Sequence, residues 1–121
     1  MSKITVHSLL ETIIQSQIVE PKHLEAISSL QPRSDEPEQL ALELINKGWL
    51  TSFQAEQLLQ GKSQQLVLGP YIVMDKLGEG GMGQVYKARH GGSGKICAIK
   101  VIRNERLGNP NYVRRFLRAN L

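Results

Sequence analysis

The stretch LGEGGMGQVYKA, residues Leu77 to Ala88, carries the most informative pattern in this chain. It places Gly78, Gly80 and Gly83 in the spacing G-x-G-x-x-G, and a backbone without Cβ atoms can pass close to phosphate groups. The spacing alone is weak, because at an average glycine content a chain of this length shows it by chance about once in 25. The residues that follow the glycines must therefore distinguish between the phosphate-binding folds.

One alternative is a dinucleotide-binding βαβ unit, in which the third glycine enters a helix and the pyrophosphate lies at the helix N-terminus. Glu105, which follows a predicted strand, would then hold the ribose. However, the segment QVYKARHGGSGK, residues 84–95, is a poor helix, because it begins with β-formers and carries three glycines soon after. The pattern favours a strand and a turn at this place.

The residues around the glycines predict an antiparallel meander. The stretch LVLGPYIVMDKL is rich in β-branched and aromatic residues and predicts a strand that is interrupted at Gly69-Pro70. Residues 84–90 and 95–102 predict two more strands, with a flexible turn between them. Two consecutive hairpins of this kind form an antiparallel sheet.

A second motif accompanies the glycines. CAIKV, residues 97–101, matches V-A-I-K with Lys100 as its lysine, and Val85 extends the glycine motif to G-x-G-x-x-G-x-V. On these two motifs, residues 70–118 resemble the start of the N-terminal lobe of serine/threonine protein kinases. The segment LGEGGMGQVYKARH, residues 77–90, looks most like the eukaryotic-like kinases of bacteria. The resemblance covers about 40% of the chain.

The resemblance implies that these residues bind ATP. The glycine backbone would cover the phosphates and donate N–H groups, and Lys100 would offer a positive charge to the α- and β-phosphates. Val85 and Ala98 would enclose the adenine, with Leu77 at its edge. Core packing is the alternative role for these apolar residues, and a solvated side chain is the alternative for Lys100. The expected ATP-binding residues are Leu77, Gly78, Glu79, Gly80, Gly81, Met82, Gly83, Gln84, Val85, Ala98 and Lys100.

The sequence departs from the kinase pattern in its catalytic parts. Neither H-R-D-x-x-x-x-N nor D-F-G occurs, so the catalytic base and the Mg²⁺ ligands are expected outside this chain. We therefore assign no catalytic or metal-binding residue and expect no phosphotransferase activity from the chain alone. A truncated kinase is the favoured interpretation, and a pseudokinase-like nucleotide sensor is the alternative.

The end of the chain is expected to continue the kinase pattern. PNYVRRFLRANL predicts the start of the helix that follows the lysine strand in the family, with Pro110 in its first turn. Family spacing would place the glutamate that pairs with the strand lysine at position 119, but that residue is Ala119 and no acidic residue follows Glu105, so this glutamate is missing. With the neighbouring strand expected beyond Leu121, strand 95–102 should present an open edge and promote self-association.

Residues 1–61 predict a duplicated helical hairpin that forms a small four-helix bundle. Apolar residues recur at helical spacing, and the two halves of this region align at an offset of 31 residues. Pro21 and Pro37 fit the first turns of the second and third helices. Gly48 fits a helix C-terminus, and Thr51 with Gln54 forms a T-x-x-Q capping box for the fourth helix. The aligned apolar pairs include Leu9 with Leu40, Ile13 with Leu44 and Ile27 with Leu58.

Charge also separates the two halves. Residues 1–69 carry a net charge of −3 and residues 70–121 a net charge of +7, whereas the whole chain carries +4. The acidic half argues against binding a polyanion, and Arg114, Arg115 and Arg118 at helical spacing are typical of a solvated face. No nucleic-acid partner is expected.

Together these patterns predict an α+β chain. Its expected parts are a helical interaction domain over 1–61, a linker and first short strand over 62–69, and a partial kinase N-terminal lobe over 70–121. The expected partners are ATP, the protein substrates of a full-length kinase, and a protein that binds or dimerises through 1–61. The alternative function is a non-enzymatic interaction module with a vestigial nucleotide-binding segment. The single Cys97, the lack of an 18-residue apolar run and the lack of a signal peptide predict a cytoplasmic location.

Overall fold

The computed structural model describes residues 4–30, 35–80, 83–103 and 113–119. The chain divides into two compact units, Met1–Leu68 and Gly69–Leu121, which we call the helical unit and the sheet unit. Helices and an antiparallel sheet occur in separate parts of the sequence, so the predicted α+β class is confirmed. None of the helices in the described part of the chain is both long enough and apolar enough to cross a membrane.

The helical unit contains the four predicted helices. Both prolines stand in the first turn of their helix, where a missing N–H costs nothing. The stretch 62–69, predicted as a linker and first short strand, contains a short 3₁₀ turn, η1, at whose end Leu66 is completely buried. The elements are α1 (Val6–Ser16), α2 (Pro21–Ser28), α3 (Pro37–Asn46), α4 (Ser52–Leu59), η1 (Ser63–Leu66) and the two-residue strand β1 (Val67–Leu68).

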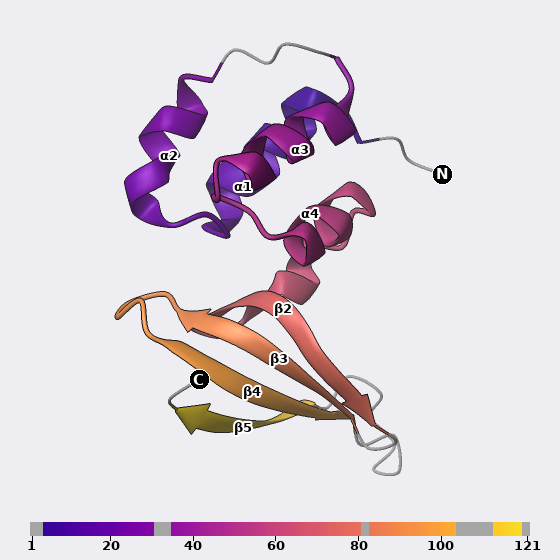
Figure 1. The fold of residues 1–121 in the computed structure, drawn as a ribbon, viewed down its shortest axis with the longest axis vertical. Coiled ribbons are helices and arrows are strands. Elements are labelled where there is room, and N and C mark those ends of the chain that lie inside the picture. Colours follow the sequence, from indigo (N-terminus) through magenta and orange to yellow (C-terminus); the bar gives the residue numbers. More distant parts are fainter. Residues whose placement is uncertain (1–3, 31–34, 81–82, 104–112, 120–121) are drawn as a thin grey trace. The chain divides into compact units, whose positions relative to one another are not determined.

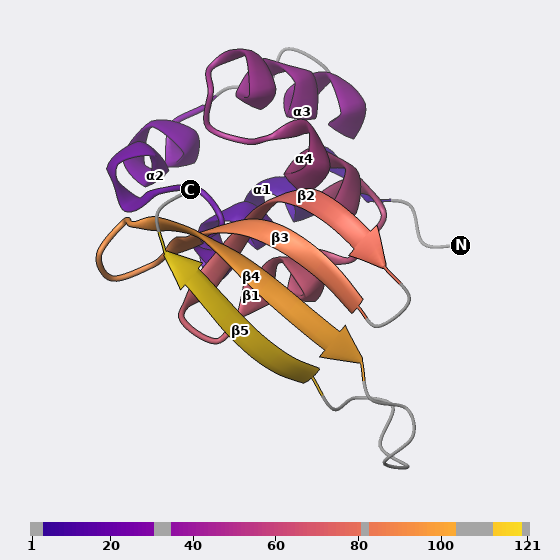
Figure 2. The same ribbon diagram turned by 60° about the horizontal axis from the view of Figure 1, so that its bottom comes forward.

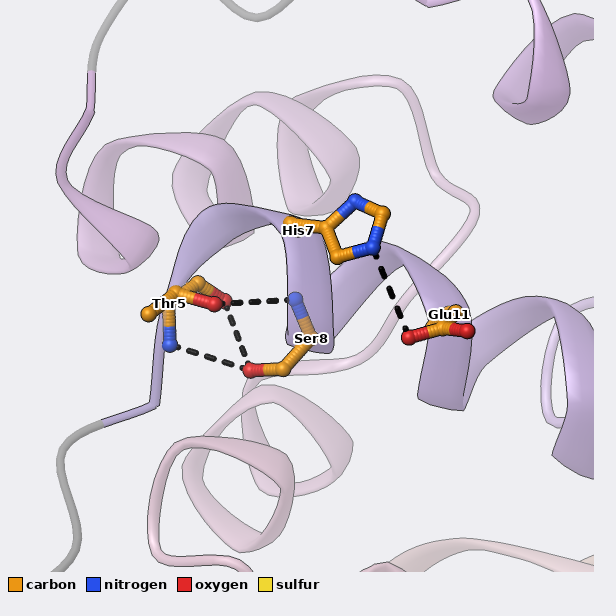
Figure 3. Close-up of polar contacts among 4 residues, drawn as sticks. All are labelled: Thr5, His7, Ser8 and Glu11. Atoms are coloured by element: carbon orange, nitrogen blue, oxygen red, sulfur yellow. Dashed lines mark hydrogen bonds and ion pairs between the residues drawn. The ribbon is translucent and has the colours of Figure 1, made fainter.

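Two of these helices begin with a capping box. At α4 the Thr51 hydroxyl accepts from the Gln54 amide and the Gln54 side chain accepts from the Thr51 amide, both at 3.0 Å, as the sequence predicts. At α1 Thr5 and Ser8 form the same reciprocal pair (Figure 3). Sequence analysis missed it because serine replaces the usual Glu or Gln. The same view shows the exposed His7–Glu11 pair, one turn apart at 3.6 Å.

The helix bounds follow the 31-residue offset. Shifting α2 by 31 residues gives α4, and shifting the start of α1 gives the start of α3. The chain also leaves α1 and α3 through equivalent left-handed residues, Gln17 at φ 59° and Gly48 at φ 76°. The equivalent core residues are all less than 5% exposed, namely Leu9 and Leu40, Ile13 and Leu44, Val19 and Leu50, and Ile27 and Leu58. The two hairpins are therefore the same structural unit used twice.

The sheet unit is an antiparallel meander, as predicted. Its strands follow one another in the order β2-β3-β4-β5, and Figures 1 and 2 show them side by side in one twisted sheet. Because the residues after the third glycine form a strand and not a helix, the dinucleotide-binding alternative is wrong. The strands are β2 (Tyr71–Gly80), β3 (Gly83–His90), β4 (Ile96–Arg103) and β5 (Val113–Ala119).

The helix expected near the end of the chain does not form. Residues 113–119 instead form β5, which pairs with β4 from Cys97↔Ala119 to Arg103↔Val113. An isolated two- or three-turn helix is marginal in water, whereas pairing along β4 satisfies backbone groups of both strands. The expected start of the helix at Pro110 lies outside the described residues.

Two expectations depended on this helix, one for the role of position 119 and one for the edge of β4, and both must be revised. Ala119 lies in a strand opposite Cys97. The position of the lysine-pairing glutamate was derived for a helix, so that derivation does not apply to position 119. The prediction that β4 presents an open edge is also wrong, because β3 pairs with one edge and β5 with the other. Both edges of β4 are therefore paired within the chain, so β4 is not available for the edge-to-edge association that the sequence suggested.

Candidate functional site

The register of β3 and β4 brings three of the predicted site residues onto one face of the sheet. Val85 lies directly opposite Lys100, and Lys87 lies opposite Ala98. Side chains that are opposite each other share a face, and alternate residues of a strand return to it. Val85, Ala98 and Lys100 therefore share one face of the sheet unit, which we call the lysine face.

Gly78 continues the lysine face onto β2, where it pairs with Val85. Glycine is usually required where φ is positive or where another atom approaches the backbone too closely for a Cβ. Neither reason applies at Gly78: its φ lies outside the left-handed region, and a Cβ built there would meet no described atom within 4 Å. The one feature of the described fold that favours glycine here is the register shift of β2 between Lys76 and Gly78, since a glycine within a strand often marks a bulge.

The lysine face is open beside Gly78 and covered at its other end. Lys100 is exposed and Val85 is half-buried, whereas Ala98 is only 8% exposed. Farther from the glycines, Ile72 and Arg89 lie opposite each other and are both 6% exposed. The exposed part of the lysine face therefore lies at the glycine end, beside the charge of Lys100.

The opposite face of the sheet forms the core of this unit. Its residues include Val73, Ala88 and Ile99, which are completely buried. Cys97 lies on the same face, and burial raises the pKa of its thiol. A protonated, buried thiol is a poor nucleophile, so Cys97 is a packing residue.

At the hairpin end this opposite face carries a connected set of polar side chains. The Gln84 Nε2 donates to Glu79 Oε1 at 3.1 Å, and the Lys76 Nζ lies 3.2 Å from the same oxygen. The Tyr86 hydroxyl donates to Gln84 Oε1. The hydrogen bond from Gln84, followed by the hydrogen bond and charge of Lys76, holds the pKa of Glu79 below its usual value.

The predicted site residues thus lie in different places on the sheet unit. Gly78, Val85, Ala98 and Lys100 come together on the lysine face, and Gly80 pairs with Gly83 where the hairpin closes. Glu79 and Gln84 point their side chains to the opposite face, so only their backbones can serve a ligand on the lysine face. Leu77 lies in a register shift of β2 with its side chain 51% exposed, and Gly81 and Met82 lie outside the described residues.

One cation on the lysine face was missed by sequence analysis. Lys87 lies two residues from Val85 on β3, opposite Ala98, and is half-buried. Its alternation with Val85 along the strand was the signal that could have identified it. The described residues contain no group of three or more His, Cys, Asp or Glu side chains arranged to hold a metal ion.

Comparison with known proteins supports a kinase relationship for part of the chain. Over 57 residues it is 39% identical to an Aurora kinase of Saccharomyces cerevisiae (strain ATCC 204508 / S288c). The match covers 47% of this chain and 16% of that protein, so the chain spans less than a fifth of its relative. No family model matches the chain, and no solved structure matches it. The curved antiparallel sheet is compatible with a kinase N-terminal lobe, and the expected likeness to bacterial kinases stays a prediction.

Proposed function

We propose that the sheet unit is the ATP-binding portion of a protein-kinase N-terminal lobe, and that ATP binds at the glycine end of the lysine face. The 57-residue similarity to a kinase supports the family, and the strand register supports the location. In a full-length serine/threonine kinase this portion would position ATP for transfer of its γ-phosphate to a protein hydroxyl.

The observation that carries the proposal is a glycine that neither a positive φ nor a close contact requires, aligned with an exposed lysine. A glycine within a strand costs about 0.5–1 kcal/mol relative to alanine. At Gly78 the described structure offers no compensating backbone strain or close contact. A phosphate that approaches the backbone would provide such a contact, because a Cβ would stand in its path. Gly78, Val85 and Lys100 are aligned across three neighbouring strands.

Each residue of the lysine face then has a chemical role. Lys100 supplies a compact positive charge to the phosphates. Hydrogen bonds come from the backbone N–H groups of the β2–β3 hairpin around Gly78, Gly80 and Gly83, which we call the glycine hairpin. The small Ala98 and the branched Val85 provide apolar surface for the adenine ring. Mg²⁺ would accompany the phosphates, but its ligands and the catalytic base are not assigned to this chain. The sheet unit therefore binds and orients ATP, and no transfer step is assigned to it.

The test is ATP binding by isothermal titration calorimetry with the full chain, first in EDTA and then with Mg²⁺. We expect weak binding, because one face of a sheet encloses little of the ligand. Lys100→Met should weaken it about tenfold, since a charge-assisted contact to phosphate is lost. Lys95→Met, which removes the same charge from an exposed turn residue, is the matched control.

Two outcomes would overturn the proposal. One is the absence of any heat of binding at millimolar ATP from a chain whose circular dichroism shows that it is folded. The other is equal weakening by Lys100→Met and Lys95→Met, which would show that ATP responds only to the net positive charge of this half of the chain. Tripolyphosphate in place of ATP separates the contribution of the phosphates from that of the adenine.

A further inference from the structure

We propose that Lys76, Glu79, Gln84 and Tyr86 form a clasp that positions the glycine hairpin for its ligand from the opposite face of the sheet. This inference rests on the proposed function, because the ligand whose affinity the clasp sets is ATP on the lysine face. None of the four side chains would touch that ligand. They are positioning residues that act through the backbone of β2 and β3.

The geometry of the clasp links the two strands on both sides of an irregularity. Lys76 pairs with Tyr86 and Glu79 pairs with Gln84, and between these pairs β2 shifts register at Leu77. The Lys76–Glu79 ion pair spans the shift along β2, at 3.2 Å. The Gln84–Glu79 hydrogen bond crosses from β3 to β2 at 3.1 Å, and the Tyr86 hydroxyl fixes Gln84 along β3.

The position of Gly78 explains why the clasp matters for binding. Gly78 lies between the two clasped pairs and faces the other way, opposite Val85. A register shift and a glycine together leave this part of β2 with little conformational restraint of its own. Cross-strand side-chain pairs restrict it from behind, so the backbone that would meet the phosphates is ordered before the ligand arrives. Preorganisation of this kind raises affinity by lowering the entropy that binding must remove.

The clasp is also consistent with the exposure of its members. Side chains of Lys76 and Glu79 are 34% and 62% exposed, and exposed ion pairs contribute little to overall stability. Gln84 and Tyr86 are half-buried. Loss of one clasp contact should therefore change the mobility of the hairpin more than the stability of the fold.

The test measures ATP affinity and hairpin mobility in the same variants of the full chain. Gln84→Ala, Lys76→Gln and Glu79→Gln should each weaken ATP binding about two- to fivefold, which is the range of a single cross-strand pair. Hydrogen exchange followed by mass spectrometry should show faster exchange in residues 76–86 and unchanged exchange in 96–101. The exposed Lys22–Glu20 pair of the helical unit, 3.4 Å apart, supplies the matched charge controls Lys22→Gln and Glu20→Gln.

A charge swap distinguishes positioning from a general effect of charge. The double variant Lys76→Glu with Glu79→Lys should recover most of the affinity that either single reversal loses, while net charge stays at the wild-type value. If wild-type chain binds ATP and the clasp variants bind it equally well, the clasp proposal is wrong and the proposed function stands. If wild-type chain does not bind ATP, the proposed function fails. Faster exchange of residues 76–86 without any change in affinity would also reject the clasp, because it would show a purely structural role.

Discussion

Gly48 of the helical unit and Gly78 of the sheet unit stand in contrasting backbone environments. In the helical unit Gly48 has φ 76° and ends a helix, where a side chain would be strained. In the sheet unit Gly78 has no left-handed φ and no described neighbour within 4 Å of a Cβ. The first glycine is required by its backbone conformation, whereas neither a positive φ nor a close contact requires the second. This difference is the basis for the proposed ligand at Gly78.

The same contrast holds for the polar residues of the two units. In the helical unit the hydrogen bonds of Thr5 and Thr51 cap helix N-termini. The core of this unit consists mainly of apolar residues at equivalent positions of the two hairpins. In the sheet unit a polar network occupies one side of the glycine hairpin while an exposed lysine occupies the other. The contacts of the helical unit serve its own fold, whereas the proposed phosphate ligand concerns the sheet unit.

The largest expected effect tests the equivalence of the two helical hairpins. Ile13 and Leu44 are equivalent by the 31-residue offset and are both completely buried. Truncating either to alanine should cost about 2–5 kcal/mol, and the two costs should be similar. The measurement is urea denaturation followed by the fluorescence of Trp49, the only tryptophan, which lies in this unit.

The matched control for this pair is Leu42→Ala, at a position that is 51% exposed on α3. It should change the free energy of unfolding by less than about 0.5 kcal/mol. Costs that differ widely between Ile13→Ala and Leu44→Ala would contradict the view that the two hairpins share one core arrangement.

A smaller effect tests the contrast between the two glycines. Gly48→Ala should destabilise the helical unit by about 1–2 kcal/mol, because alanine is strained in the left-handed region. Gly78→Ala should leave the stability of the sheet unit unchanged or slightly raised and should weaken ATP binding. Trp49 reports on the first unit, and the three tyrosines, which all lie in residues 69–121, report on the second.

The opposite pattern would remove the reason for placing a ligand at Gly78. Marked destabilisation by Gly78→Ala, with ATP affinity unchanged, would mean that the fold needs this glycine after all. Gly94, in the turn before β4 with φ 75°, is a useful control within the sheet unit. Its replacement by alanine should behave like that of Gly48.

The smallest expected effect is a pH dependence of the glycine hairpin. The pKa of Glu79 is lowered by Gln84 and Lys76, so its stabilising contribution is present above the ordinary carboxyl pKa. That contribution is lost as the pH falls through the lowered pKa. The tyrosine-detected melting temperature of wild type should exceed that of Glu79→Gln slightly at pH 7, and the difference should vanish in acid. A difference that is constant from pH 7 to pH 3 would show that the charge of Glu79 plays no part.

Much of the fold could be predicted because local signals were strong. Pro21, Pro37, Gly48 and the Thr51–Gln54 pair each mark a helix end by a specific backbone requirement, and all four are confirmed. The strands beside the glycines were equally clear. Residues 113–119 were misassigned because the kinase resemblance and Pro110 suggested the start of a helix, whereas the strand depends on pairing with the preceding strand β4.

The candidate site could be predicted in its composition but not in its geometry. The motifs named Val85, Ala98 and Lys100, and only the register shows that Gly78 is aligned with them and that Lys87 joins the same face. The motifs also grouped Glu79 and Gln84 with the site, although their side chains point away from it. A motif records which residues are present, whereas strand pairing determines the face on which each side chain lies.

The most direct test of ATP binding on the lysine face is methyl NMR of the full chain during titration with ATP. Val85 and Ala98 carry methyl groups on the lysine face, and Val73, Ala88 and Ile99 carry them on the opposite face. We predict progressive shifts of the Val85 and Ala98 methyl signals that Lys100→Met suppresses, with the signals of the opposite face nearly unchanged. Equal shifts on both faces, or shifts confined to Val73, Ala88 and Ile99, would contradict this prediction.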